Sequence, residues 1–158
     1  MNSGKSAIRW VMPATAGYSG TPLLKKLGYD AVAAKGGRAL LIGAERGPPE
    51  LAAFDGFADR RLANSAARPA AGPFDLIHIF ETDFEKLRAA LPLLRARLAS
   101  AGMIWVSWPK KASKMPTTIT EDLIRAIALN KGGLVDVKVC AVDEVWSGLK
   151  LVIPVKLR

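Results

Sequence analysis

The sequence predicts an α/β fold with three layers, a Rossmann-like arrangement whose sheet is mostly parallel and ends in a C-terminal antiparallel hairpin. Two apolar runs, residues 75–80 and 102–108, are each followed by a helical pattern. Two β-rich runs, 135–145 and 149–155, are separated only by Trp146-Ser147-Gly148, which we expect to form the turn. Strands separated by helices are usually parallel, whereas a short turn joins antiparallel neighbours.

The size and composition predict a single domain. The chain has 158 residues, of which 50% are hydrophobic, enough to bury a core of its own. We expect residues 1–16 to be a loosely held N-terminal arm and residues 17–158 to form the domain. The formal net charge of +9 favours acidic partners, such as nucleic acid, an anionic small molecule or an anionic membrane surface. Solubility alone also explains this charge, because the basic residues are spread along the chain without one dominant block.

Several classes of protein are excluded by simple counts. Cys140 is the only cysteine and His78 the only histidine, so the chain forms no internal disulfide and no Cys-rich or His-based metal site. No apolar stretch approaches the roughly 20 residues of a membrane span. The apolar residues around Trp10 are too few for a signal peptide. We therefore expect no metal and a cytoplasmic location.

The first half of the chain contains one clear strand. We expect a short helix over 22–27, capped by Thr21 and ended by Gly28, because proline suits a first helical turn and glycine a left-handed C-terminal cap. The apolar run 38–43 reads as a buried strand, and a helix start follows at Pro48-Pro49. Further on, residues 57–73 show only a weak edge strand near residue 61.

The helices of the second half begin at two capping boxes. Thr82 with Glu85, and Thr118 with Glu121, each place a hydroxyl before a helix and a glutamate three residues on. The first helix has an amphipathic stripe at spacings of three and four. This stripe comprises Phe84, Leu87, Leu91, Leu94 and Leu98.

The loop after the first strand is a candidate cofactor-binding turn. In open α/β sheets, ligands bind outside the carboxyl ends of the strands, where glycine lets the backbone approach a phosphate. Gly43 and Gly47 frame a G-x-E-x-G pattern in which Glu45 occupies the central position. An ordinary strand-to-helix turn would give the same pattern. Asp59 is the nearest candidate for an acid that would bind ribose hydroxyls.

A basic loop after the strand 102–108 is the strongest candidate for anion binding. Pro109 ends the strand, and Lys110, Lys111 and Lys114 then follow at the ligand edge of the sheet. Adjacent ammonium groups suit phosphate or carboxylate, and Trp108 offers a flat surface for a base. The alternative is a solvated loop beside a core tryptophan.

Two further ionisable positions lie on or after the strand 75–80. Glu81 lies at its end, where a general base or a cofactor ligand could sit, and the neighbouring Asp83 also suits a helix N-terminus. His78 lies in mid-strand between isoleucines, where a hydrogen-bonded core histidine is more common than a catalytic one.

Three segments carry distinctive combinations of residues: Ala16-Gly17-Tyr18-Ser19-Gly20-Thr21-Pro22-Leu23, Trp105-Val106-Ser107-Trp108-Pro109-Lys110, and Val135-Asp136-Val137-Lys138-Val139-Cys140 through Trp146-Ser147-Gly148-Leu149-Lys150. Together they resemble a small bacterial domain family of unknown function. More distantly, residues 40–47, 74–77 and the final hairpin resemble class I S-adenosylmethionine-dependent methyltransferases in strand order. That resemblance implies a truncated methyltransferase-type sheet and S-adenosylmethionine as a possible cofactor. Glu45 and the short stretch 44–74 depart from the pattern, and no N-P-P-Y-type motif is present.

The function predicted from these observations is a non-catalytic binding or regulatory module for an anionic ligand or a protein partner. Its site would combine the loop 43–47, Glu81 and the loop 108–111. One alternative is an active methyltransferase with an atypical cofactor site in the same loops. A second is a nucleic-acid-binding module that relies on the net positive charge.

Overall fold

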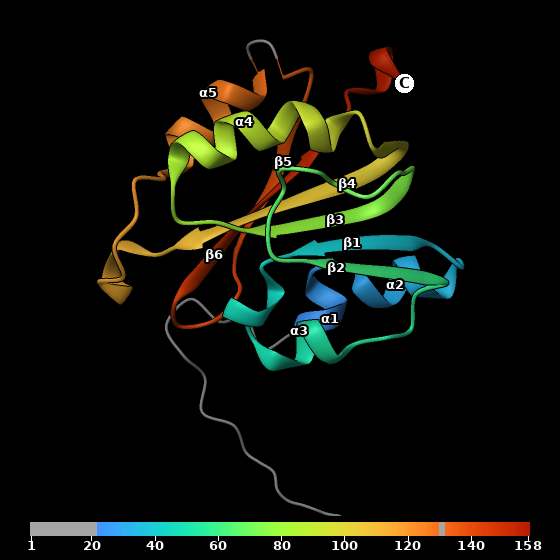
Figure 1. Ribbon diagram of the computed structural model, residues 1–158, viewed down its shortest axis with the longest axis horizontal. Coiled ribbons are helices and arrows are strands. Elements are labelled where there is room, and N and C mark those ends of the chain that lie inside the picture. The colour runs from blue at the N-terminus through green and yellow to red at the C-terminus, as the bar shows by residue number, and fades with distance from the viewer. Residues whose placement is uncertain (1–21, 130–131) are drawn as a thin grey trace, which may run out of the picture.

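A computed structural model of the protein describes residues 22–129 and 132–158 (Figure 1). The predictions about the arm 1–16 and the cap at Thr21 lie outside the described residues. The elements are α1 (Leu23–Lys26), α2 (Tyr29–Ala34), β1 (Arg38–Ile42), η1 (Ala44–Arg46), α3 (Pro49–Ala53), β2 (Asp59–Ala63), β3 (Phe74–Phe80), α4 (Phe84–Arg95), β4 (Leu98–Pro109), η2 (Lys111–Ser113), α5 (Glu121–Leu129), β5 (Val135–Ala141), β6 (Trp146–Val152) and η3 (Val155–Leu157).

The sheet has six strands in the order β2-β1-β3-β4-β6-β5. Strands β1, β2, β3 and β4 are parallel to one another, and β6 is antiparallel to both β4 and β5. The predicted mostly parallel sheet with a C-terminal hairpin is confirmed, as is the edge position of β2. Strand order reverses beside β1, because β2 lies on one side of it and β3 on the other.

The helices form two outer layers around this sheet (Figure 1). Strand residues alternate between the two faces. Ile77 and Ile79 of β3 pack in the core beneath α4 and α5, whereas Leu76 and Phe80 pack in the core that α1, α2 and α3 cover. Between β2 and β3, the segment 64–73 has no helix or strand, and its Ala66 and Ala70 pack on the α4 side. A short coil therefore takes the place of a longer crossover.

Helix α4 differs from its prediction at both ends. Its N-cap is Asp83, whose carboxylate accepts a hydrogen bond from the Glu85 N–H at 2.9 Å, rather than Thr82. It ends at Arg95, and Leu98 begins β4 instead of a further turn. Leu98 is buried in the core that the helix also faces. The apolar residue at this spacing is therefore explained by burial in the core, whether it lies in a helix or in a strand.

The start of α5 also differs from its prediction. Thr120 caps this helix by accepting a hydrogen bond from the Leu123 N–H at 3.2 Å. Thr118, the predicted cap, instead accepts a hydrogen bond from the Phe84 N–H at the start of α4, at 2.8 Å. Its own N–H donates to the Thr82 carbonyl. The loop before α5 therefore caps the neighbouring helix.

The hairpin turn is earlier than predicted. Residues 142–145 connect β5 to β6, and Trp146-Ser147-Gly148 belongs to β6. Asp143 organises the turn, since its carboxylate accepts hydrogen bonds from the backbone N–H groups of Val145 and Trp146. Gly148 packs closely on the neighbouring strand, because a Cβ there would lie 3.2 Å from the Trp105 ring.

No helix among the described residues is long and apolar enough to span a membrane.

Candidate functional site

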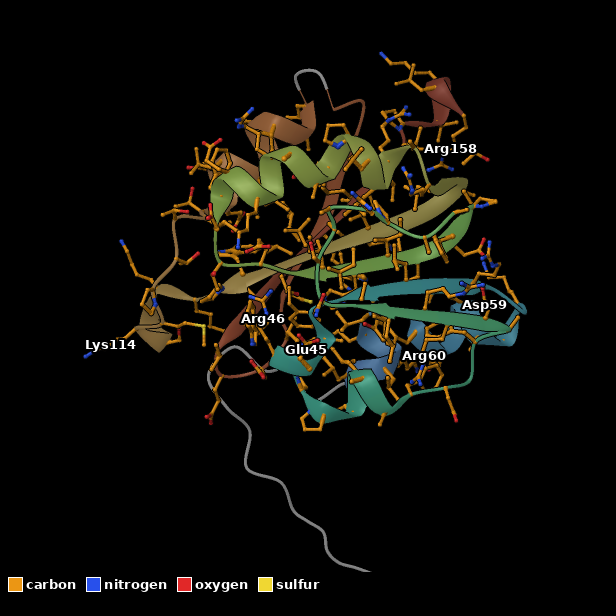
Figure 2. The ribbon with its side chains drawn as sticks, in the orientation of Figure 1. Glu45, Arg46, Asp59, Arg60, Lys114 and Arg158 are labelled. Atoms are coloured by element: carbon orange, nitrogen blue, oxygen red, sulfur yellow. The ribbon has the colours of Figure 1, made fainter. Side chains whose placement is uncertain are left out.

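The carboxyl ends of the parallel strands bring three predicted loops to one edge of the sheet. Because β1, β3 and β4 run in the same direction, Gly43, Glu81 and Lys110 all begin their loops at this edge. Figure 2 shows Arg46 and Glu45 here, with Lys114 farther along the same edge. The opposite edge carries Asp59. The predicted site loops therefore share one edge of the molecule.

Asp59 lies at the wrong end of β2 for the ribose-binding role predicted for it. It is the first residue of the strand, paired with Arg38 at the start of β1. Its carboxylate accepts hydrogen bonds from Arg38 at 2.9 Å and from Arg61 at 3.3 Å. Hydrogen bonding from Arg38 is the largest cause of the lowered pKa of Asp59. At the ligand edge, β2 ends in Ala63 and is followed by the uncharged Asn64 and Ser65.

The two glycines of the loop after β1 are in contact with Phe80 of β3. Gly43 has φ +72°, and a Cβ there would lie 2.9 Å from the Phe80 carbonyl oxygen and 3.2 Å from the Arg46 guanidinium. A Cβ on Gly47 would lie 2.4 Å from the Phe80 ring. Fold packing thus accounts for both glycines. The space that a Gly-rich turn usually leaves for a ligand is filled by this chain's own residues.

The two acidic residues near this loop, Glu81 and Glu45, differ in their contacts. One carboxylate oxygen of Glu81 accepts hydrogen bonds from the N–H groups of Thr82 at 2.9 Å and Asp83 at 3.0 Å. This oxygen is therefore turned toward the backbone that leads into α4. The Glu45 side chain is exposed and does not line the cavity beside α4.

A cavity of about 290 Å³ lies between α4, the coil after β2 and the loop after β1. Its volume is close to the roughly 300 Å³ at which small-molecule sites typically begin. Arg46 and Lys86 supply positive charge, and Glu81 is its one acidic residue. The other lining residues are polar Asn64 and Ser65 together with Ala66, Ala67, Ala89, Ala90 and Leu93. The cavity therefore combines a basic, polar side with an apolar wall from α4.

The basic loop after β4 is not part of this cavity. Lys110 is anchored by its backbone N–H, which donates to the Val145 carbonyl at 2.7 Å. Lys111 and Lys114 are exposed, and Lys114 has φ +62°. Trp108 is only 7% exposed and packs in the α4-side core, which leaves little of its ring for a base. The loop can still attract anions, but it offers no stacking surface.

His78 is fully buried and makes hydrogen bonds through both ring nitrogens. Its Nδ1 lies 2.7 Å from the Tyr29 hydroxyl and its Nε2 lies 2.7 Å from the Ser107 hydroxyl. Burial lowers the pKa of His78 to about 3 and raises the pKa of Tyr29. The ring stacks on Phe80 with 4.3 Å between centroids. This hydrogen-bonded chain is sealed inside the core, as expected of a structural histidine.

Four cavity residues were not predicted from the sequence: Arg46, Asn64, Ser65 and Lys86. Arg46 lies inside the loop 43–47, for which the predicted site residues were only the glycines and Glu45. Lys86, Ala89, Ala90 and Leu93 have helical spacing along one face of α4 and could have been recognised as a wall. Asn64 and Ser65 gave no signal, because their segment has no regular pattern. Among the described residues, no three His, Cys, Asp or Glu side chains gather as a metal site requires.

Comparison with known proteins gives structural matches only. No protein-family model matches the chain, and no curated protein matches it in sequence. The structure of mitomycin 7-O-methyltransferase matches with a TM-score of 0.54 and 15% identity over 80% of this chain. This chain spans 53% of that protein, about half of its length.

Two other matches cover more of the known protein. A ribosomal protein L11 methylase from Lactobacillus delbrueckii subsp. bulgaricus matches with a TM-score of 0.52 and 18% identity, over 81% of this chain and 75% of that one. Magnesium protoporphyrin IX methyltransferase from Synechocystis PCC 6803, solved with bound S-adenosylhomocysteine, matches with a TM-score of 0.54 and 12% identity, over 82% and 80%. At these identities the matches establish the fold alone. The chain therefore has a shortened form of the fold found in class I S-adenosylmethionine-dependent methyltransferases.

Proposed function

We propose that the protein is a non-catalytic module that binds a small anionic ligand in the cavity beside α4. The observation that carries this proposal is the charge of the cavity. Arg46 and Lys86 contribute two cations, while an oxygen of the acidic Glu81 already accepts two backbone hydrogen bonds. Opposite charges attract more strongly in a partly enclosed site than in bulk water. A phosphate or carboxylate group would therefore complement the basic side.

The apolar wall narrows the chemistry of the ligand. Ala89, Ala90 and Leu93 present small or aliphatic side chains to the cavity along one side of α4. Apolar surface favours a ligand that carries a flat or hydrocarbon part besides its charge. Adenosine monophosphate has both parts, and the hydroxyl and amide groups of Ser65 and Asn64 suit a sugar. It serves as a probe of the cavity, with inorganic phosphate as the smaller anion.

S-adenosylmethionine is the cofactor that the fold would suggest, and the residues present do not fit it. The glycines after β1 are packed against Phe80 and Arg46. The acid that would hold ribose hydroxyls is absent from the carboxyl end of β2, where Asn64 follows the strand. The sulfonium group of this cofactor is positively charged, and the cavity already contains Arg46 and Lys86. These features favour a binding role over a transferase role.

Calorimetric titration tests the proposal. We expect adenosine monophosphate to bind, and the paired variants Arg46→Ala and Lys86→Ala to weaken binding by about tenfold or more, which corresponds to roughly 1.4 kcal/mol. A matched control removes two charges elsewhere, Lys35→Ala with Lys156→Ala, and should leave binding unchanged. Binding that is insensitive to Arg46 and Lys86 would exclude the cavity as the site.

The same titrations test two alternatives, an anion site in the basic loop after β4 and an active methyltransferase. Lys111→Ala with Lys114→Ala examines the basic loop, and loss of binding in this pair alone would place the anion site there. Micromolar binding of S-adenosylmethionine and S-adenosylhomocysteine would support the active methyltransferase instead. Because the Glu45 side chain lies outside the cavity, we expect Glu45→Gly to leave the affinity for either compound unchanged.

A further inference from the structure

Strand β5 forms one outer edge of the sheet. It pairs with β6 on its inner side, and its outer side pairs with no strand among the described residues. An edge strand presents a row of backbone N–H and C=O groups that can pair with another chain. The pairing of β5 with β6 shifts register between Asp136 and Lys138, so the regular part of this edge is its second half.

One face of this edge is basic. Lys138 of β5 lies opposite Lys150 of β6, so their Cβ atoms are roughly 5 Å apart. Like charges on directly opposite residues are destabilising. The Lys138 ammonium lies 3.4 Å from the Lys26 carbonyl of α1, so it points to the side of the sheet that α1 covers. Burial, followed by the charge of Lys138, lowers the pKa of Lys150. Neither Lys138 nor Lys150 makes an ion pair within the described part of the chain.

The other face of the same edge is apolar and open. Because strand residues alternate, Val139 points away from the lysines toward the side of α5, and it is 48% exposed. Val137, at the register shift, is 53% exposed. Asp136 does not offset the lysines, since its carboxylate accepts a hydrogen bond from Arg125 of α5 at 2.8 Å. The edge strand and its neighbour β6 thus present Lys138 and Lys150 on one face, and β5 presents Val139 on the other.

The charge of Lys138 and Lys150 indicates which kind of molecule could bind along β5. The residues before Pro22 include Lys5 and Arg9 and no acidic residue, so this segment does not complement the lysines. A second copy would bring another Lys138 and Lys150 to the same edge. Nucleic acid would match the lysines but would leave the valines without an apolar partner. An acidic polypeptide with apolar side chains complements both faces.

We propose that β5 accepts an extended segment of an acidic partner protein as an additional strand. Backbone hydrogen bonds to the outer edge of β5 would supply affinity, and side-chain alternation would supply specificity. Acidic side chains of the segment would face Lys138 and Lys150, and its apolar side chains would pack beside Val139. The recognised sequence is therefore an alternation of acidic and β-branched apolar residues. This site is separate from the cavity beside α4.

A fluorescein-labelled nine-residue peptide of alternating valine and glutamate is the probe. We expect saturable binding in fluorescence anisotropy and slower amide exchange at residues 138–141 when the peptide is present. Lys138→Glu should weaken binding by about tenfold or more. The same change should raise the melting temperature of the free protein, because it replaces a like-charge pair with an opposite one. A loss of binding in this variant would therefore not reflect unfolding.

Three controls test separately the position of the charge, the apolar contact and the acidity of the peptide. Lys156→Glu makes the same charge change away from β5 and should leave peptide binding unchanged. Val139→Thr keeps the β-branched shape and should weaken binding of the valine–glutamate peptide. A peptide with lysine in place of glutamate should not bind. No binding of the acidic peptide, or equal binding by Lys138→Glu, would overturn the proposal.

An oligonucleotide separates this proposal from the nucleic-acid reading. A twelve-nucleotide oligothymidine is compared with the peptide on the natural protein and on both variants. If it binds more tightly than the peptide, and if Lys138→Glu weakens its binding while Val139→Thr does not, the lysines bind nucleic acid and the proposal is wrong. Arg46→Ala with Lys86→Ala should leave peptide binding intact. The proposals for the peptide site and for the cavity can therefore be disproved independently of each other.

Discussion

At the scale of single residues, Gly47 shows how closely the loop after β1 packs on β3. Replacing it with alanine would place a methyl group 2.4 Å from the buried ring of Phe80. We expect Gly47→Ala to lower the free energy of unfolding by about 1–3 kcal/mol, the usual cost of overpacking. Urea denaturation followed by circular dichroism measures this difference.

A double-mutant cycle assigns that cost to Phe80. In a Phe80→Leu background the ring that would clash is absent, so Gly47→Ala should cost much less than in the natural sequence. Equal costs in both backgrounds would mean that the Phe80 ring is not the source of the cost.

At the scale of elements, α4 depends on a cap from a distant part of the chain. The Thr118 hydroxyl accepts the hydrogen bond from the Phe84 N–H, and Thr117 donates its own hydroxyl to the Thr82 carbonyl. We expect Thr118→Ala to destabilise the protein by about 1 kcal/mol, as loss of a helix cap usually does. Amide exchange should become faster at Phe84 in particular.

Thr120→Ala is the matched control for this cap. It removes the equivalent hydroxyl at the start of α5, so faster exchange should appear at Leu123 and not at Phe84. If Thr118→Ala left exchange at Phe84 unchanged, the contact between the two loops would contribute nothing to α4.

Most of the elements could be predicted from local sequence patterns, because apolar runs and helical stripes report burial directly. The ends of these elements were harder to predict. Leu98 continued the helical spacing of α4 although the chain had already turned into β4. Gly148 resembled a turn residue, yet its missing side chain makes room for Trp105. In each case a tertiary contact, invisible in the local pattern, decides the residue's role.

The candidate site was less predictable than the fold. The positions of Gly43 and Glu81 at the ligand edge follow from strand direction, which the sequence predicts. The cavity instead needs Arg46, Asn64 and Lys86 from three separate segments, and their meeting depends on the path of the coil 64–73. That coil has no periodic pattern from which a path could be inferred.

At the scale of the whole molecule, His78 makes stability depend on pH. Its pKa falls from 6.5 to about 3 on burial, so below pH 6.5 the unfolded chain binds a proton that the folded protein excludes. Stability from the neutral ring is present above pH 6.5 and is lost as the pH falls toward 3. We expect a slope of up to about 1.4 kcal/mol per pH unit. Urea denaturation between about pH 6.5 and pH 4.5 measures it.

Two variants isolate this effect. His78→Gln should flatten the slope in that window, because no histidine remains. Tyr29→Phe should keep the slope while costing about 1–3 kcal/mol at every pH, since it leaves a buried ring nitrogen without its hydroxyl partner. The pKa values of Asp59 and Asp136 are lowered below 3.8 by their arginines, so these groups lose their contributions only at lower pH. A slope that survives in His78→Gln would contradict the assignment.

The position of β6 between β4 and β5 has a consequence for how the chain is made. On the ribosome, β5 is synthesised before β6, yet among the described strands β5 pairs with β6 alone. The edge of β4 also stays open until residues 146–152 emerge, and the core face around Trp105 stays open with it. The first four strands can assemble during translation, but the sheet closes only when its sixth strand inserts into the gap. A nascent chain that stalls in the hairpin would therefore carry an exposed β4 edge, which can pair with another chain.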